Sequence, residues 1–401
     1  MDAEDGTVPL DETYAETVNY HGRVFQQHAL DSKIYYAPID DEEIARLGNM
    51  HTMLRTVFDN RLIFPPVVRP QRILECGFGA AHWAVDVAEH YPDAEVVGLD
   101  ISPHMIPEEM PHNLDLQVDD LNGEFTFPSN YFNVVHSQMM AGGIHATRWP
   151  SYLQDMYRVL LPGGWCQLVE IYFNAQSDNG TLSPDHALSR WSRGYLDALH
   201  PQKDPRAALR LKDWMRNAGF TDIESRLLTL PMCPWPTDPR DHAIGALNVS
   251  NVSQLLYSMG LYPFTHIRGM PLEDFQLLVA QARSEATNSS YRVSKANTSC
   301  FKSKVIWLTE GRRSNCRPTS LCKSKSNDFG EPGGWDNGDL PRTTADMSSL
   351  DGSRTNNGVT RAAAALCNWQ LKRRCRACLE GLKADCLNRG QTELSWEGFQ
   401  S

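Results

Sequence analysis

Short apolar stretches alternate with amphipathic segments through the middle of the chain. In the amphipathic segments near 80–90 and 150–161, apolar residues recur at steps of three and four, which indicates helices. The apolar stretches are too short for helices and predict strands at 73–76, 95–99, 116–118, 131–137 and 165–170. Because strands joined by crossover helices form parallel sheets covered on both faces, we expect an α/β, Rossmann-like fold.

Helical patterns flank this alternating region on both sides. From residue 19 to residue 64 the pattern is helical, and Ile44, Leu47, Met50 and Leu54 share one face. Further on, we expect a helix at 211–219 and two helices, near 241–260 and 271–285, that cover the carboxyl edge of the sheet. A strand that ends at 230 and another at 304–308 would complete a seven-stranded, mostly parallel sheet.

Changes in composition suggest boundaries along the chain. Residues 1–18 are acidic and polar, and we expect them to be disordered. An N-terminal helical extension follows at 19–66, and Pro65 and Pro66 end it. The main domain spans 67–312, with a core at 70–175 and a cover with the last strands at 176–312. Residues 313–401 are poor in aliphatic residues and predict a low-complexity, disordered tail.

Charge and cysteine content narrow the functional class. The net charge of −11 argues against nucleic-acid binding, which needs clustered Lys and Arg. The first residues lack signal-peptide features, and no apolar stretch reaches the roughly 18 residues that indicate a membrane helix. The cysteines before residue 312 are widely spaced, as expected for reduced thiols: Cys76, Cys166, Cys233 and Cys300. We therefore expect a cytoplasmic protein without membrane contact; the alternative location is the nucleus.

Residues 72–101 have the pattern of a strand–loop–helix–strand unit that holds a nucleoside. Gly77 and Gly79 follow the first strand and allow a sharp turn close to a ligand. Asp100 ends the second strand, 23 positions after Gly77. That interval is close to the one at which a carboxylate reaches a ribose.

Two positions indicate which ligand this unit binds: the place of the third glycine, and the acid before the first glycine. A dinucleotide fingerprint needs a third glycine where this chain has His82, so the pyrophosphate of NAD is disfavoured. Glu75 can bind the amino acid end or the ribose of S-adenosylmethionine. This cofactor carries an ammonium and a sulfonium and has no phosphate. We expect S-adenosylmethionine, and the alternatives are NAD and a unit that binds no ligand.

Several motifs keep a fixed order along the chain: residues 73–79, Asp100, and residues 119–120, 132–137 and 161–165. This order resembles that of class I S-adenosylmethionine-dependent methyltransferases. More narrowly, segments 35–51, 82–98 and 218–236 resemble the fungal LaeA-like group tied to secondary metabolism, and the resemblance extends over residues 19–310.

The resemblance implies a role for each cofactor-binding residue. The glycines would pack on the amino acid portion, Asp100 would accept both ribose hydroxyls, and Ile101 would pack on the adenine. Asp120, or Asp119, would bond the exocyclic amine, and the Leu121 amide would lie near a ring nitrogen. The predicted cofactor-binding set is Glu75, Gly77, Gly79, Asp100, Ile101, Asp119, Asp120, Leu121 and His136.

Two positions depart from the family pattern. Ala81 stands where the family has its third glycine, and Asn133 stands where the family has an acid at the start of a strand. Residues 313–401 match no part of the family that we recognise.

The sequence assigns no catalytic residue. Methyl transfer depends mainly on orientation and exclusion of water, so a catalytic pair is not required. His51, His136 and His145 are each either a possible base or a structural residue. Tyr35 and Tyr36 could close over the sulfonium or serve in packing.

We predict no metal site. Met139 and Met140 suit a substrate wall better than a metal site. In the tail, Cys367, Cys375, Cys378 and Cys386 contain one close pair, whereas a four-cysteine zinc site normally has two. A basic, disordered tail is the alternative to zinc there.

The expected function is an S-adenosylmethionine-dependent methyltransferase that acts on a small-molecule acceptor in fungal secondary-metabolite biosynthesis. The alternative is a LaeA-like nuclear regulator with the same fold, which would act through protein partners. A nicotinamide-dependent oxidoreductase is the third possibility.

Overall fold

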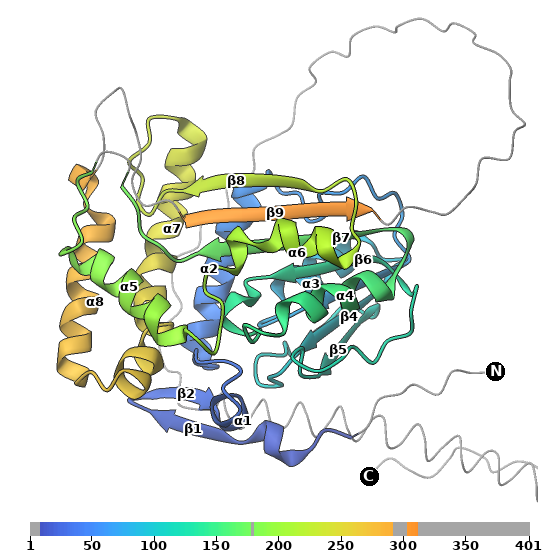
Figure 1. The fold of residues 1–401 in the computed structure, drawn as a ribbon, viewed down its shortest axis with the longest axis horizontal. Helices are drawn as coiled ribbons and strands as arrows, with labels where there is room; N and C mark the ends of the chain where they lie inside the picture. Colours follow the sequence, from blue (N-terminus) through green and yellow to red (C-terminus); the bar gives the residue numbers. More distant parts are fainter. Residues whose placement is uncertain (1–8, 178–179, 292–302, 312–401) are drawn as a thin grey trace, which may run out of the picture.

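A seven-stranded sheet runs through the centre of the protein, in the order β5-β4-β3-β6-β7-β9-β8 (Figure 1). The computed structural model describes residues 9–177, 180–291 and 303–311. The parallel strands are β3 (Arg72–Cys76), β4 (Glu95–Asp100), β5 (Leu114–Val118), β6 (Phe132–Gln138) and β7 (Leu160–Tyr172). The last strands, β8 (Glu224–Leu230) and β9 (Ser303–Gly311), extend the β7 edge in antiparallel pairing. The expected α/β, Rossmann-like class is confirmed.

Neighbouring residues of β3 point into different cores. Ile73 is fully buried with Trp83 and Val87 of helix α3 (His82–His90). Leu74, the next residue, is fully buried on the other face with Tyr152 of helix α4 (Trp149–Val159), and helix α6 (Leu211–Ala218) completes that layer. Because strand side chains alternate between faces, a continuous apolar stretch here means a sheet covered on both sides.

Asn133 has a structural role at the amino end of the sheet. Its side-chain oxygen accepts hydrogen bonds from the backbone N–H groups of Gln71 (2.8 Å) and Arg72 (2.9 Å). These bonds join the start of β3 to β6. The amide oxygen of Asn133 makes this contact in place of the acid that the family pattern has there. Because Asn133 lies at the amino end of the sheet, the change does not alter the carboxyl edge.

The N-terminal extension begins as a β-hairpin, so the prediction of a helical pattern from residue 19 was wrong for its first part. Strands β1 (Thr17–Tyr20) and β2 (Arg23–Gln26) pair antiparallel. His21 and Gly22 form the turn, with φ of 51° and 82°. Two left-handed residues in a two-residue loop match the right-handed twist of a hairpin. The two-residue turn at His21 and Gly22 therefore favours a hairpin here, although the apolar pattern suggested a helix.

Helical structure starts after this hairpin, with the short helix α1 (Gln27–Asp31) and then helix α2 (Asp41–Val57). The 3-10 helix η1 (Glu12–Ala15), capped by the Asp11 side chain, precedes the hairpin. Residues 12–18 therefore have defined structure, contrary to the expectation of disorder through residue 18. The predicted tail at 313–401 lies outside the described residues.

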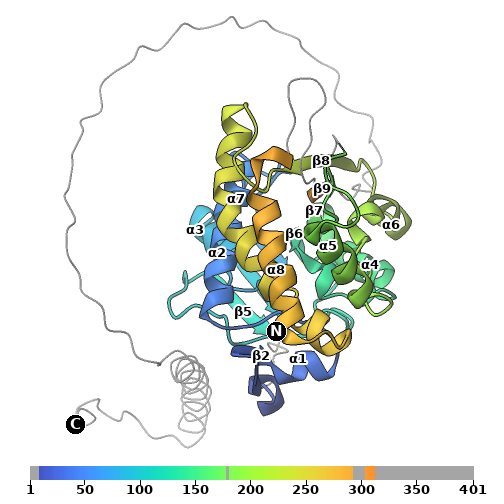
Figure 2. The same cartoon turned by 90° about the vertical axis from the view of Figure 1, so that its left-hand side faces the viewer.

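A helical layer lies at the carboxyl ends of the parallel strands, on the side toward which β7 points (Figure 1). Helices α5 (Ala187–Leu199), α7 (Pro239–Ser258), α8 (Leu272–Thr287) and the π-helix η4 (Pro263–Ile267) form it. Their buried core includes Trp191, Leu256 and Phe275. Helix α2 packs against α7, and α7 packs against α8 (Figure 2). Of the described helices, none is long and apolar enough to cross a membrane.

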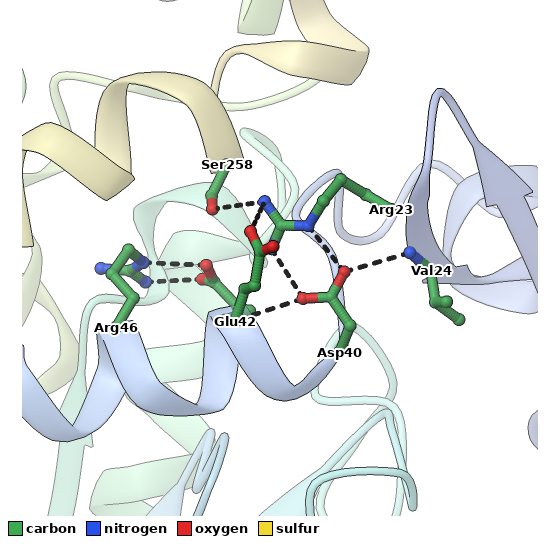
Figure 3. Close-up of polar contacts among 7 residues, drawn as sticks. Arg23, Val24, Asp40, Glu42, Arg46 and Ser258 are labelled. Atoms are coloured by element: carbon green, nitrogen blue, oxygen red, sulfur yellow. Dashed lines mark hydrogen bonds and ion pairs between the residues drawn. The ribbon is translucent and has the colours of Figure 1, made fainter. Parts of the chain in front are cut away.

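Two buried ion pairs join the extension to this layer (Figure 3). The Arg23 guanidinium donates to both oxygens of Asp40, at 2.7 and 2.6 Å, and also to the Ser258 hydroxyl of α7 at 3.1 Å. Asp40 in addition caps α2 by accepting from the Glu43 N–H at 3.1 Å. The hairpin, α2 and α7 are thus held in one arrangement.

The second pair lies one turn further along α2. Arg46 donates to both oxygens of Glu43, at 2.9 and 2.6 Å, and to the Asn251 side chain of α7 at 3.1 Å. The Glu43 and Arg46 side chains are 0% and 3% exposed. A pair that is so well buried depends on both partners, because either charge alone has no water to solvate it.

Substitution of Glu43 tests this dependence. Glu43→Ala leaves the Arg46 charge buried and unpaired, so it should lower the free energy of unfolding by about 3–5 kcal/mol. The adjacent Glu42 is the matched control, since its side chain is 77% exposed and 3.5 Å from Arg23. Glu42→Ala should change stability by about 1 kcal/mol at most. Urea unfolding of both variants gives the comparison, and equal losses would contradict the role of the buried pair.

Candidate functional site

A cavity of about 1080 Å³, including its open mouth, lies at the carboxyl edge of the sheet. The β3–α3 turn, the ends of β4 and β5, helix α2 and the hairpin strand β2 contribute to its walls. All of the predicted set except His136 line it, namely Glu75, Gly77, Gly79, Asp100, Ile101, Asp119, Asp120 and Leu121. Residues that are far apart in the sequence therefore meet around one volume.

The β3–α3 turn uses three left-handed residues. Gly77 has φ of 82°, which strains any other residue, and a Cβ there would lie 2.1 Å from the Met140 sulfur, so the methionine side chain would have to move. Gly79 has φ of 55°. Ala81 has φ of 59° at the N-cap of α3, a conformation that costs a non-glycine residue about 1–2 kcal/mol. Ala81 therefore adopts a left-handed conformation that a glycine would adopt without this cost.

Asp100 connects this turn to the end of β4. The Gly79 N–H donates to Asp100 Oδ2 at 2.8 Å, and the Ser102 N–H donates to Oδ1 at 3.0 Å. Burial raises the pKa of Asp100, and these backbone hydrogen bonds oppose the rise. Since each carboxylate oxygen has two lone pairs, Asp100 keeps acceptor capacity for the hydroxyls of a ligand.

Two buried oxygen atoms in the cavity wall have no hydrogen-bond partner within the described part of the chain: Glu75 Oε2 and Gln26 Oε1. Burial, and then the nearby Asp100 charge, raise the pKa of Glu75 well above its usual value. A buried acceptor without a donor is costly, so both atoms suit a ligand that brings donors.

Sequence reasoning missed Gln26. It comes from β2, and its side-chain nitrogen donates to the backbone oxygens of Tyr14 (2.8 Å) and Ile101 (2.9 Å), which aligns the side chain in the cavity wall. The helical interpretation of the extension hid this residue. The turn at His21 and Gly22 was the signal that could have revealed the hairpin.

The Asp119–Asp120 turn forms the next part of the wall. The Asp119 N–H donates to the Asp100 backbone oxygen at 3.0 Å, and Asp120 Oδ1 accepts from both the backbone and the side-chain nitrogen of Asn122 at 2.9 Å. Behind the turn, the fully buried Lys203 donates to the Gly143 backbone oxygen at 2.8 Å. Burial lowers the pKa of Lys203 to about 7.

The segment from Met139 to Gly143 forms an adjoining part of the wall, since the Asn122 side chain donates to the Gly143 backbone oxygen at 3.2 Å. Met139 and Met140 line the cavity, and their role as a substrate wall stays a prediction. The buried Glu170 accepts hydrogen bonds from the N–H groups of Met140 (2.7 Å) and Ala141 (3.2 Å). Burial raises the pKa of Glu170 to about 8. The Glu170 side chain therefore fixes the backbone at Met140 and Ala141.

His136 does not line this cavity. Its ring is 1% exposed and stacks on Trp83 at a centroid distance of 3.9 Å, and burial lowers its pKa to about 3. Contrary to the prediction, His136 therefore does not reach the cavity. It pairs with Glu75 in the sheet register, but Trp83 of α3 covers its ring.

The remaining candidates divide between cavity and packing. Tyr35 lines the cavity, whereas Tyr36 stacks on Tyr262 at 5.6 Å in the helical layer. His145 lies outside the lining, and its backbone N–H donates to the Asn122 side chain at 2.7 Å. His51 lines the cavity and bonds through Nε2 to Asp86 Oδ2 at 2.8 Å. The tail cysteines lie outside the described residues.

Comparison with known proteins agrees with this geometry. A family model described as a methyltransferase domain matches residues 73–164. The secondary metabolism regulator laeA of Monascus pilosus is 32% identical over 290 residues, which cover 70% of this chain and 76% of that protein. Methyltransferase pytC of Aspergillus terreus is 30% identical over 291 residues, with 71% and 87% covered. The protein-methionine methyltransferase laeA of Emericella nidulans is 30% identical over 288 residues, with 70% and 75% covered.

The fold and the site are those of a class I methyltransferase that uses S-adenosylmethionine. Within that class, the chain belongs to the LaeA-like methyltransferase family.

The residues of the cavity fit this cofactor. Glu75 Oε2 offers a buried acceptor to an ammonium group, Asp100 offers oxygens to ribose hydroxyls, and Ile101 gives an apolar surface for a base. Gln26 Oε1 offers a further acceptor from the extension. The cavity wall therefore includes a residue outside the part that matches the domain model.

Substitution of Asp100 tests its assignment to the ribose. Asp100→Ala should weaken S-adenosylmethionine binding by about 1.5–3 kcal/mol, the usual contribution of hydrogen bonds to a charged group. Asp93→Ala is the control, because Asp93 is exposed and lies outside the cavity lining. Calorimetric titration measures both dissociation constants, and an Asp100→Ala protein with unchanged affinity would refute the assignment.

Glu75 predicts a proton release on cofactor binding. Burial raises the pKa of Glu75 well above its usual value in the free protein. An adjacent ammonium would stabilise the carboxylate and lower that pKa. The affinity should therefore increase with pH until Glu75 is ionised in the free protein. Calorimetry in buffers of different ionisation enthalpy counts the protons, and Glu75→Gln should abolish the release. A wild-type protein that releases none would contradict the contact.

Proposed function

We propose that this protein transfers the methyl group of S-adenosylmethionine to a small-molecule acceptor in fungal secondary-metabolite biosynthesis. One observation carries the proposal, namely that the cofactor cavity continues into an apolar wall. Acidic and amide groups line one part, and apolar side chains line the rest: Ile34, Leu47, Met50, Met139 and Ile144. An enclosed apolar wall with few polar groups is typical of small-molecule sites.

His51 is the base of this proposal. Asp86 accepts from Nε2, so the proton of the neutral ring lies there and Nδ1 remains as the acceptor. Arg55 also binds Asp86 Oδ2 and keeps that carboxylate in place. An acceptor hydroxyl or amine would lose its proton to Nδ1 as its bond to the methyl carbon forms. The carbon–sulfur bond of the activated donor breaks in the same step, and S-adenosylhomocysteine leaves.

A regulatory role is the second candidate, and the names of the relatives favour it. Two of the three relatives reported above are called laeA, and one of these a secondary metabolism regulator. In that case the protein would act in the nucleus on protein partners. If the protein is instead a methyltransferase that acts on small molecules, we propose that it is located in the cytoplasm.

Two measurements separate these candidates. Isotopically labelled S-adenosylmethionine, incubated with the purified protein and cell extract, should label a compound of low molecular mass; label in protein alone would favour the regulator. A deletion strain should lack one methylated product and accumulate its precursor. Altered transcript levels of many biosynthetic gene clusters would instead support regulation.

Substitution of His51 tests the proposed base. With the acceptor identified as above, His51→Ala should lower the turnover number by about 10²–10⁴-fold, the usual contribution of general base catalysis. S-adenosylmethionine affinity should change little, and Asp86→Asn should cause a smaller loss of turnover. His90→Ala is the control, since His90 is exposed at the end of α3. Unchanged single-turnover rates in the His51→Ala protein would rule out this base.

A further inference from the structure

Strand β2 ends at Gln26, which is 2% exposed and lines the cofactor cavity. Two backbone carbonyl oxygens fix the orientation of its side-chain amide, because Nε2 donates to Tyr14 at 2.8 Å and to Ile101 at 2.9 Å. A carbonyl oxygen can only accept, so the amide nitrogen has to face both of them. Both N–H groups of that nitrogen are then used, and Oε1 lies on the other side of the amide.

Gln26 Oε1 is a buried acceptor to which no group in the described ranges donates. An amide oxygen buried in this way costs free energy unless a donor reaches it. The cavity that Gln26 lines is the site of S-adenosylmethionine. This cofactor brings three kinds of donor, namely an ammonium group, two ribose hydroxyls and the adenine amine. We therefore compare these three as partners of Oε1.

The position of Gln26 favours the ribose. Its amide is bonded to the backbone of Ile101, the residue directly after Asp100, and Asp100 is the acceptor assigned to the ribose. The acids assigned to the other donors lie at other strands, since Glu75 belongs to β3 and the Asp119–Asp120 turn follows β5. Each Asp100 oxygen already accepts one backbone N–H. A neighbouring acceptor lets one ribose hydroxyl donate to Gln26 and the other to Asp100.

The hairpin that carries Gln26 is also bonded to the helical layer. Arg23, three residues earlier in β2, donates to the Ser258 hydroxyl of α7 at 3.1 Å, and the hydroxyls of Tyr20 and Thr265 hydrogen-bond at 3.0 Å. A two-stranded hairpin has little stability of its own in water, so its order depends on such contacts. A ligand bonded to Gln26 adds one more contact, at the end of β2, and so stabilises the hairpin.

We propose that Gln26 Oε1 accepts a hydrogen bond from one ribose hydroxyl of the methyl donor, and that the β1–β2 hairpin is thereby held against the bound cofactor. Asp100 binds the other hydroxyl. The inference concerns the methyl donor alone, so it holds for a small-molecule acceptor and for a protein acceptor. It assigns part of cofactor recognition to the extension, outside the matched domain at 73–164.

S-adenosylhomocysteine and its 2′-deoxy and 3′-deoxy analogues are the probes, because they differ only in the ribose hydroxyls. Calorimetric titration gives their affinities for the full-length wild type and for Gln26→Met, which removes the amide and keeps a side chain of similar length. Gln26→Met should weaken S-adenosylhomocysteine binding about three- to tenfold, the value of one hydrogen bond. For one of the two analogues the loss should be smaller by that factor, because its bond to Gln26 is already absent. A merely structural effect would weaken all three ligands alike.

Gln27→Met is the matched control, with the same substitution at the next residue. The Gln27 side chain donates to Asp31 within α1 at 2.8 Å and lies outside the cavity lining. This variant should bind all three ligands as the wild type does.

Hydrogen exchange gives a second test, which needs no substitution at Gln26. In the wild type, S-adenosylhomocysteine should slow the exchange of the backbone N–H groups at 17–26 by about three- to tenfold, since opening of the hairpin would break the bond to the ribose. The analogue that lacks the bonded hydroxyl should give no such protection there. It should still protect the β3–α3 turn at 77–79, which shows that it is bound.

The proposal is overturned if Gln26→Met weakens the binding of all three ligands equally, or of none. It is also overturned if S-adenosylhomocysteine leaves the exchange of the hairpin unchanged, which would leave a water as the partner of Oε1. No acceptor takes part in these measurements, so their failure would not affect the proposed function. A protein that shows the ribose contact and labels no small molecule would contradict the proposed function alone.

Discussion

The site depends on one carboxylate with two backbone N–H groups bonded to it. Asp100 stands at the end of β4 and accepts from Gly79 in the turn after β3 and from Ser102 in its own loop. This side chain therefore joins the carboxyl ends of β3 and β4. The strained turn at Gly77, Gly79 and Ala81 persists because the sheet, α3 and this carboxylate hold both of its ends.

Two ion pairs hold the N-terminal extension in place, as Asp100 holds the β3–α3 turn. Arg23 with Asp40, and Arg46 with Glu43, fix the hairpin and α2 against α7. Such pairs lose hydration on burial, so their geometry and their remaining hydrogen bonds must be nearly complete. Both pairs have bidentate contacts and a third partner on α7. They therefore define one position of α2, and this position sets where His51 and Leu47 meet the cavity.

Local pattern in the sequence was enough to predict the parallel strands and, in the cavity wall, Glu75, Gly77, Gly79 and Asp100. The family resemblance added Ile101, Asp119, Asp120 and Leu121, which also line the cavity. Glycines, strand-end acids and apolar stretches indicate turns and strands from the few residues around them. The failures came from contacts between distant segments. Gln26 lies in a hairpin strand, and its side chain bonds to the Ile101 backbone 75 positions later in the chain. His136 is covered by Trp83 from α3. Helix α5 was missed, and its burial depends on α7 and α8.

The extension and the matched domain share one cavity. The domain at 73–164 supplies the glycine turn and the strand-end acids, while α2 and β2 come from outside it and bring Gln26, Leu47 and Met50 to the wall. A mutation in the extension can therefore reshape this wall while the turn that Asp100 holds keeps its place. The form of the cavity can thus diverge among relatives without any change at the ends of the parallel strands.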